Sequence, residues 1–335
     1  MKTKIFGFAL PFHLQKSKSH ETLVVEPLSR WCTFSFSAWD GTTLSDIPSK
    51  GILLFFQYPP PDYITNNPRY KIVWIPMWDH IKKYTDSFWR TIPKTVRVVA
   101  FSDAVAKISR AANLPTLRLQ FYPDTKDMPK VVWDREKILF YWNRAGLIGT
   151  DDLAKLCAVL HIKKLYFQNQ LDPGLVRTLD YRLPDTLGKT DVVHLPIHLS
   201  SSRYNEILDQ ANIYIAPRTY EGVGLSFINA LSRGCFVLGH YAPTMNEYIT
   251  HNRDGFLFDL KEKYSLHSLI SNAIAVRIPK LLGGRDYQNH LNLDWKSLAD
   301  INLTEVGEKA WERARIGYEA WTDNLRSYAD YVTTW

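Results

Sequence analysis

Cysteine is scarce in this sequence of 335 residues, and features that mark whole classes of protein are missing. The three cysteines, Cys32, Cys157 and Cys235, are far apart and odd in number, which fits neither a disulfide framework nor a zinc site. The longest apolar runs, residues 5–12 and 52–56, are far too short to cross a bilayer, and no small-residue cleavage site follows the first. We therefore expect a soluble globular protein of a reducing cytoplasm.

Hydrophobic residues make up 45% of the chain, which is enough for two domains with full cores. The formal charge of +7 is unevenly distributed: up to residue 130 there are 18 basic against 10 acidic residues, and the remainder has 23 against 24. The basic excess therefore lies in the N-terminal portion. It predicts attraction to an anionic surface or substrate, such as acidic lipid headgroups, a lipid diphosphate or nucleic acid, although a basic domain that is merely soluble fits equally well.

The stretch of residues 211–260 organises the rest of the chain. It opens with a short apolar run, residues 213–216, that is typical of a buried strand. A glycine loop follows at 221–224, and apolar residues at helical spacing then predict a helix that ends at the glycine of position 234. Residues 235–238 have the pattern of the next buried strand. The predicted unit is strand, loop, helix, strand.

A carboxylate directly before a glycine loop that opens a helix suits a ligand with both hydroxyl and phosphate groups. Glu221 can accept hydrogen bonds from sugar hydroxyls, while the N–H groups of residues 222–224 and the helix N-terminus can receive phosphate oxygens. A nucleotide sugar has both parts. Taken alone, the glycine loop is better explained as a tight turn between a strand and a helix, because short glycine patterns are common.

The whole stretch resembles the donor-binding half of glycosyltransferase family 4 (glycosyl transferases group 1) and its GT-B relatives. The residues that fit the family pattern are Pro217, Glu221, Gly222, Gly224, Leu225, Ala230, Gly234 and Val237, followed by Glu247 and Gly255-Phe256-Leu257. Two positions depart from it: Asn229 replaces the second Glu of the Glu-x7-Glu pair, and Arg218 replaces a Ser. An amide both donates and accepts, so Asn229 can still bind ribose hydroxyls.

Apolar runs alternate with helical stretches along the rest of the chain, which predicts parallel sheets covered on both faces. We expect strands at 4–10, 51–57, 70–75, 96–102 and 117–122, and later at 137–142, 164–168 and 192–196, with helices at 103–112, 151–160 and 204–211. The polar segment 126–134 is the predicted interdomain linker. An apolar stripe from Trp311 to Val332 predicts core residues along one face of a single helix.

The resemblance implies an α/β GT-B fold, with two Rossmann-like domains that face a central cleft. Residues 1–130 would form the acceptor-binding domain, and residues 131–304 would form the nucleotide-sugar-binding domain. Residues 305–335 would form a C-terminal helix that crosses back to the N-terminal domain.

The resemblance also implies roles for residues outside the glycine loop. Arg144 lies where the family has Gly-Arg-Leu and is a candidate ligand of the donor diphosphate, since a guanidinium binds phosphate bidentately; the family's following Lys is absent. Asp79 and His80 lie where the family has His-Asp, with Trp78 at the His position, and are candidate catalytic residues together with Glu221. The donor-binding candidates are Arg144, Pro196, Gly222, Val223, Gly224, Leu225, Asn229 and Glu247.

The N-terminal portion offers further candidates. Residues 11–20 form a predicted polar loop after the first strand, and loops at this position line ligand clefts in doubly wound folds. The candidate cleft contacts in this loop are His13, Lys16, Lys18 and His20. Five tryptophans could stack on sugar rings or belong to the core: Trp31, Trp39, Trp74, Trp78 and Trp89.

The function implied by the resemblance is retaining transfer of a sugar from a nucleoside diphosphate sugar to a glycan or lipid-linked saccharide, in the cytoplasm or at the inner face of the membrane. No Asp-x-Asp occurs in the sequence, so we predict no metal at the diphosphate and no cofactor. The alternatives are a non-catalytic sugar-nucleotide or glycan-binding protein with a degenerate site, a DNA glycosyltransferase, or another GT-B enzyme such as an epimerase or phosphorylase.

Overall fold

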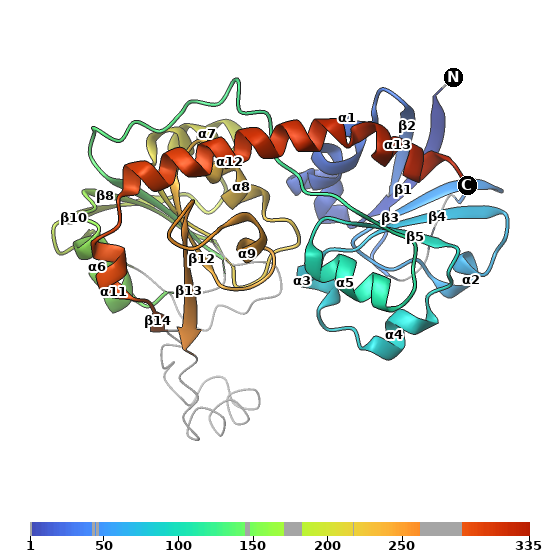
Figure 1. The fold of residues 1–335 in the computed structure, drawn as a ribbon, viewed down its shortest axis with the longest axis horizontal. Helices are drawn as coiled ribbons and strands as arrows, with labels where there is room; N and C mark the ends of the chain where they lie inside the picture. Colours follow the sequence, from blue (N-terminus) through green and yellow to red (C-terminus); the bar gives the residue numbers. More distant parts are fainter. Residues whose placement is uncertain are drawn as a thin grey trace. The chain divides into compact units, whose positions relative to one another are not determined.

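The computed structural model describes residues 2–41, 44, 47–144, 148–170, 183–216, 218–261 and 290–335 (Figure 1). These residues form two compact units, each built on one sheet of mostly parallel strands. The first unit contains Met1–Pro123, Tyr220–Leu225 and Arg315–Trp335, and the second contains Asp124–Thr219 and Ser226–Ala314. The α/β fold class predicted from the sequence is confirmed.

The first unit has the strand order β2-β1-β3-β4-β5-β6, and every pairing is parallel. The strands are β1 (Thr3–Ala9), β2 (Cys32–Ala38), β3 (Gly51–Phe56), β4 (Tyr70–Ile75), β5 (Val96–Ala100) and β6 (Thr116–Arg118). Every side chain of β3 from Ile52 to Phe56 is buried, as expected where both faces of a sheet are covered. The sequence predicted all of these strands except β2, an edge strand in which Ser and Thr alternate with Phe34 and Phe36.

Short helices follow the strands of the first unit. They are η1 (His13–Ser17), η2 (Glu21–Val25), α1 (Glu26–Leu28), α2 (Asp62–Thr65), α3 (Trp78–Ile81), α4 (Asp86–Thr91) and α5 (Asp103–Ala111). Ser102 caps α5, because its Oγ accepts a hydrogen bond from the N–H of Val105 at 3.2 Å. The prediction of a polar loop at 11–20 was wrong: η1 is a π-helix, closed by a 3.0 Å hydrogen bond from the N–H of Lys18 to the carbonyl of His13.

The C-terminal residues form two helices, α12 (Leu303–Asp323) and α13 (Leu325–Thr333), drawn in red in Figure 1. The prediction of one continuous helix was therefore wrong. The break falls at Asn324, whose side-chain Nδ2 donates to the carbonyl of Ala320 at 2.7 Å and so competes with the helical hydrogen bonds. The predicted core stripe is confirmed for Trp321 and Tyr328, which are buried with ring contacts to Phe101 at 6.1 and 6.4 Å.

The second unit has the strand order β14-β13-β12-β11-β7-β8-β10-β9, in which only the edge strands β9 and β14 pair antiparallel among the described residues. The strands are β7 (Ile138–Asn143), β8 (Lys164–Asn169), β9 (Thr186–Leu187), β10 (Thr190–Leu195), β11 (Ile213–Ile215), β12 (Phe236–His240), β13 (Phe256–Lys261) and β14 (His290–Asn292). The helices are α6 (Thr150–Val159), α7 (Ser201–Gln210), α8 (Leu225–Leu231), α9 (Met245–Tyr248), α11 (Trp295–Ala299) and the first part of α12. The strand, loop, helix, strand unit predicted at 211–238 is confirmed as β11, α8 and β12.

All three cysteines are buried and unpaired. Burial raises the pKa of the Cys32 and Cys157 thiols to about 11 and that of Cys235 to about 12, so they pack as small apolar side chains. Within the described ranges no helix is long and apolar enough to cross a membrane.

Candidate functional site

The strand order of the second unit has a reversal between β7 and β11. Chain order runs outward from β7 through β8 to β10 on one side, and from β11 through β12 to β13 on the other. In doubly wound sheets, ligands bind beyond the carboxyl ends of the strands at such a switch point. Arg144 directly follows β7, and the loop after β11 leads to Glu221. Pro217 of the family motif lies outside the described residues.

Arg144 is half-buried beside the sheet. Its guanidinium lies over the ring of Trp142, 4.5 Å from the ring centroid, which orients the planar cation at the end of β7. The preceding Asn143 is 1% exposed, and its Nδ2 donates to Oδ1 of Asn169 at the end of β8. This contact joins the ends of the neighbouring strands β7 and β8, next to Arg144 in the sequence.

The glycine loop at 221–224 belongs to the first unit, where it packs against the start of α3. Glu221 is only 5% exposed. A Cβ at Gly222 would lie 2.9 Å from Cβ of Met77 and 3.0 Å from Oδ1 of Asp79, so only a glycine permits this approach. Gly224 has φ +87°, which also favours glycine, and α8 begins at the next residue. The structure thus brings together Asp79 and the loop that carries Glu221.

The contact between α3 and the loop includes a cation that the sequence did not reveal. Lys82 Nζ lies 3.3 Å from the centroid of the Tyr220 ring, directly before Glu221. Burial lowers the pKa of Lys82, and the charge of the Asp79 carboxylate opposes that shift. No sequence motif marks Lys82 for this contact, because its partner, Tyr220, is remote in the sequence.

His80 lies among aromatic rings. Its ring centroid is 4.2 Å from that of Tyr58, and its Nε2 lies 3.1 Å from the hydroxyl of Tyr84. Burial, with a smaller contribution from the charge of Lys83, lowers the pKa of His80 to about 4. The imidazole is therefore neutral near pH 7 and can form hydrogen bonds, but it does not carry a positive charge there.

Asn229 and Glu247 are half-buried on the neighbouring helices α8 and α9, which pack through the rings of Phe227 and Tyr248, 5.6 Å apart. The backbone of each is held by an arginine. Arg233 Nη1 donates to the carbonyl of Asn229 at 3.2 Å, and Arg313 Nη2 donates to the carbonyl of Glu247 at 2.9 Å. Both arginines are fixed in turn by a carboxylate.

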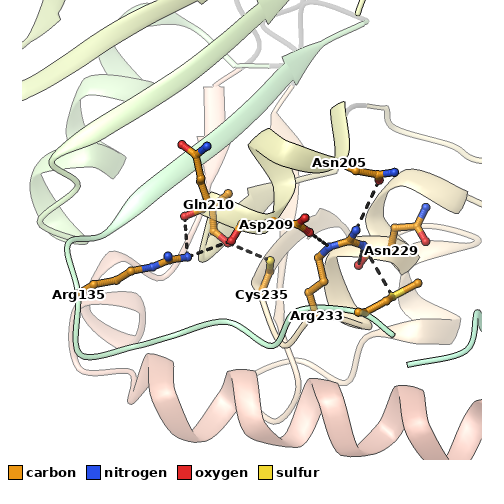
Figure 2. Close-up of polar contacts among 9 residues, drawn as sticks. Arg135, Asn205, Asp209, Gln210, Asn229, Arg233 and Cys235 are labelled. Carbon is orange, nitrogen blue, oxygen red and sulfur yellow. Dashed lines mark hydrogen bonds and ion pairs between the residues drawn. The ribbon is translucent and has the colours of Figure 1, made fainter. Parts of the chain in front are cut away.

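The two carboxylates are Asp209 and Asp254. Arg313 Nη1 lies 2.9 Å from Oδ2 of Asp254, which is 2% exposed. Arg233, 5% exposed, pairs through Nε with Oδ1 of Asp209 at 2.7 Å and also contacts Asn205, as Figure 2 shows. These pairs fix α8 to α7 and fix α9 to α12.

Pro196 and its neighbours follow β10 and are exposed. The buried Gln168 on β8 donates from Nε2 to the carbonyl of Ile197 at 3.0 Å, and Gln170 Nε2 lies 3.2 Å from Nδ1 of His198. Gln168 thus holds the backbone at Ile197, and Gln170, directly after β8, contacts the side chain of His198; the sequence did not reveal either contact.

Several predicted contacts are not available for a ligand. Trp39, Trp74 and Trp89 are at most 3% exposed and belong to the core, which is one of the two alternatives that the sequence left open. His20 is also buried, against Phe36 and Phe56. Lys16 and Lys18 are exposed, and Trp31 and Trp78 are half-buried. Among the described side chains, no group of three or more His, Cys, Asp or Glu residues could hold a metal ion.

The buried histidines predict that the protein loses stability in mild acid. Burial lowers the pKa of His20, His80 and His240 below the ordinary histidine pKa of 6.5, to about 4 for His80. Between pH 6.5 and these lower pKa values, the unfolded chain therefore binds more protons than the folded chain. Stability therefore falls as pH falls through this window. We expect His80→Asn to reduce the difference in Tm between pH 7.5 and pH 5.0, while His161→Asn at an exposed position leaves it unchanged. Equal pH dependence in the His80 variant and the wild type would contradict this.

Comparison with known proteins agrees with this geometry. Residues 182–280 match the family described as Glycosyl transferases group 1, and no curated protein matches the chain with significance. Among solved structures, the chain is similar to sucrose-phosphate synthase from Thermosynechococcus elongatus, with a TM-score of 0.64 and 12% identity over 98% of each chain.

Two further structures are similar at comparable identity. A glycosyltransferase from Rickettsia africae has a TM-score of 0.58 and 12% identity, over 99% of this chain and 98% of that one. Anabaena Alr3699/HepE, solved in complex with UDP-glucose, has a TM-score of 0.54 and 11% identity, over 97% and 100%. Identities this low establish the fold alone. The family match covers residues 182–280, and the solved structures share with this chain the α/β fold of GT-B glycosyltransferases.

Proposed function

We propose that this protein is a retaining, metal-independent glycosyltransferase that transfers a sugar to a glycan or a lipid-linked saccharide. The observation that supports donor binding most is the switch point of the second sheet, where Arg144 follows β7. Because Anabaena Alr3699/HepE binds UDP-glucose, a UDP-sugar is our first choice of donor. No cofactor is required beyond the donor itself.

The chemistry needs charge stabilisation more than it needs a nucleophile. The bond between the anomeric carbon and the diphosphate oxygen breaks, the acceptor oxygen bonds to the same face of that carbon, and the acceptor proton leaves with the diphosphate. We assign Arg144 and the N–H groups of residues 222–225 to the charge that develops on the diphosphate. Glu221 binds hydroxyls of the transferred sugar, and Glu247 and Asn229 bind the donor. Asp79 and neutral His80 contact the transferred sugar, and the backbone at Pro196 contacts the base.

The proposed acceptor is argued from the charge distribution along the sequence. The basic excess up to residue 130 supports an acceptor at an anionic membrane surface, and we propose that the enzyme works in the cytoplasm at the inner face of the membrane. We propose the boundaries 1–130, 131–304 and 305–335 for the acceptor-binding domain, the donor-binding domain and the C-terminal helix.

Thermal unfolding with a panel of UDP-, GDP-, ADP- and dTDP-sugars tests the proposal. A ligand that binds only the folded state stabilises it by about 2.7 kcal/mol at 100 times its Kd, so we expect a clear rise in Tm with UDP-sugars. Release of UDP should then follow, and EDTA should not change its rate. Binding without any release would favour a non-catalytic sugar-nucleotide-binding protein, and no rise with any nucleotide would refute the donor site.

A further inference from the structure

A cavity of about 440 Å³ lies in the first unit, where the starts of β1 and β2 meet the helix α13 (Figure 1). Its volume falls within the range of roughly 300–1,000 Å³ that is typical of sites for small molecules. Lys2, Arg30 and Trp31 line it from the strand side, and Arg326 and Asp330 line it from α13. Residues from both ends of the chain therefore enclose one space.

The cavity is at the opposite edge of the sheet from the candidate functional site. All strands of the first sheet are parallel, so their starts share one edge and their ends share the other. Lys2 and Trp31 directly precede β1 and β2, whereas Asp79 comes after the end of β4. Substrates of doubly wound folds bind beyond the carboxyl ends of the strands. A ligand in this cavity would therefore be neither the donor nor the acceptor.

Both walls of the cavity are fixed. On the strand side, the N–H of Thr3 donates to the carbonyl of Trp31 at 3.0 Å, which joins the starts of β1 and β2. On the helix side, Arg326 and Asp330 are four residues apart and so lie on the same face of α13. Tyr328 of this helix is fully buried against Phe101, which holds α13 to the unit. The lining groups therefore have defined positions before any ligand binds.

The charge of the lining is positive. Lys2, Arg30 and Arg326 carry three positive charges, and Asp330 carries the one negative charge among the lining residues. Oδ2 of Asp330 lies 3.0 Å from Nε of Arg326, a contact that uses one of the five N–H donors of a guanidinium. The positive excess attracts an anion into the cavity, and the planar guanidinium groups suit a phosphate, which they can bind bidentately.

Trp31 adds an aromatic surface beside these cations. Its side chain is half-buried and lines the cavity, and the Arg30 guanidinium lies 5.7 Å from the centroid of its ring. A phosphate alone would use the cations but not the indole. A phosphate ester that also contains a ring can use both, because the ring packs on the indole while the phosphate reaches the arginines.

We propose that this cavity binds a small soluble phosphate ester that contains a ring, such as a sugar phosphate. The site goes beyond the proposed function, since it does not depend on which reaction the protein catalyses. The bound phosphate links Arg326 of α13 to Lys2 and Arg30 at the starts of the first two strands. Binding therefore stabilises the docking of the C-terminal helix on the first sheet.

Calorimetry with the full-length protein at low ionic strength, where charge interactions are least screened, tests the site. We expect ribose 5-phosphate to bind at least threefold more tightly than inorganic phosphate, and ribose alone not to bind. The double variant Arg30→Gln, Arg326→Gln should weaken the binding of both phosphates at least tenfold. Arg90→Gln, at an exposed position on α4, should change neither affinity as much as twofold. Ribose 5-phosphate should raise the Tm of the wild type but not that of the double variant.

Trp31→Leu separates the ring from the phosphate. This variant should bind ribose 5-phosphate only as tightly as inorganic phosphate, while its affinity for inorganic phosphate stays within twofold of the wild type. Without ligand, the double arginine variant should unfold close to the Tm of the wild type, because the Arg326–Asp330 pair is at the surface.

Three results would overturn the proposal. The first is that the wild type binds neither phosphate at millimolar concentrations, and the second is that the double variant binds both as tightly as the wild type does. The third is equal binding of the two phosphates by the wild type, which would refute a ligand with a ring. Flotation with phosphatidylglycerol vesicles provides a further check: if the wild type bound the vesicles but neither soluble phosphate, and the double variant lost the vesicles, these cations would contact a membrane surface instead.

Discussion

Replacing Glu221 with glutamine is expected to lower kcat/KM for sugar transfer by about 10²- to 10³-fold, the cost typical of removing one preorganised group at the reacting centre. The carboxylate is 5% exposed, and the loop that carries it is fixed by the close approach of Gly222 to Met77 and Asp79. A buried, fixed acceptor of hydrogen bonds gains strength from the low dielectric around it. Steady-state kinetics with varied donor would measure the loss.

Glutamine has the shape of glutamate, so the fold of this variant should be retained, and its Tm should lie close to that of the wild type. Glu206→Gln is the matched control, because Glu206 is exposed on α7 and pairs with Arg203 at the surface. We expect that variant to keep full activity. If the Glu221→Gln variant kept full activity, Glu221 would not be part of the active site. Asp79 would then be the next carboxylate to test.

The second large effect concerns stability. Arg233→Met should lower the free energy of unfolding by about 3 kcal/mol, the lower end of the range measured when one partner of a buried ion pair is removed, because the side chain of Asp209 is 32% exposed. The guanidinium side chain is 6% exposed and fixes Asp209, Asn205 and the carbonyl of Asn229, so its loss leaves several polar groups without their partner (Figure 2). Urea unfolding would measure the change.

Arg203→Met provides the comparison, because the Arg203–Glu206 pair is about half exposed on both sides. Surface pairs contribute about 0–1 kcal/mol, so its unfolding curve should nearly overlay that of the wild type. A second comparison is the double variant Arg233→Met, Asp209→Leu, which removes both charges and should recover part of the loss. If the Arg233 and Arg203 variants lowered the free energy of unfolding equally, burial would not strengthen the Arg233–Asp209 pair.

The part of the fold that could be predicted from the sequence is the part encoded by neighbouring residues. The unit from β11 to β12 was predicted because its strand, its glycines and its helical spacing all lie within 211–238. Gly224 confirms the reasoning, since its φ of +87° is a conformation that favours glycine. The strands that are buried on both faces, such as β3, were equally visible as continuous apolar runs.

The features that were missed depend on partners remote in sequence. Lys82 packs on Tyr220, and Gln57 bonds to His13, so neither contact has a local signal in the sequence. The π-helix at 13–17 was missed because its residues are polar and lack helical spacing of apolar side chains. His20 was assigned to a cleft for its chemistry, whereas packing against Phe36 and Phe56 placed it in the core.

The interleaving of the two units has a consequence for dissecting the enzyme. The first unit takes Trp321 and Tyr328 from the C-terminal end of the chain, and the Tyr328 hydroxyl reaches the carbonyl of Leu23 at 3.4 Å. A fragment that stops near residue 123 would therefore expose the apolar surface that these two rings cover. No single cut in the polypeptide separates the two units, so they cannot be exchanged between homologues by a simple two-piece chimera. A working hybrid must take its C-terminal segment from the parent that supplies the N-terminal one.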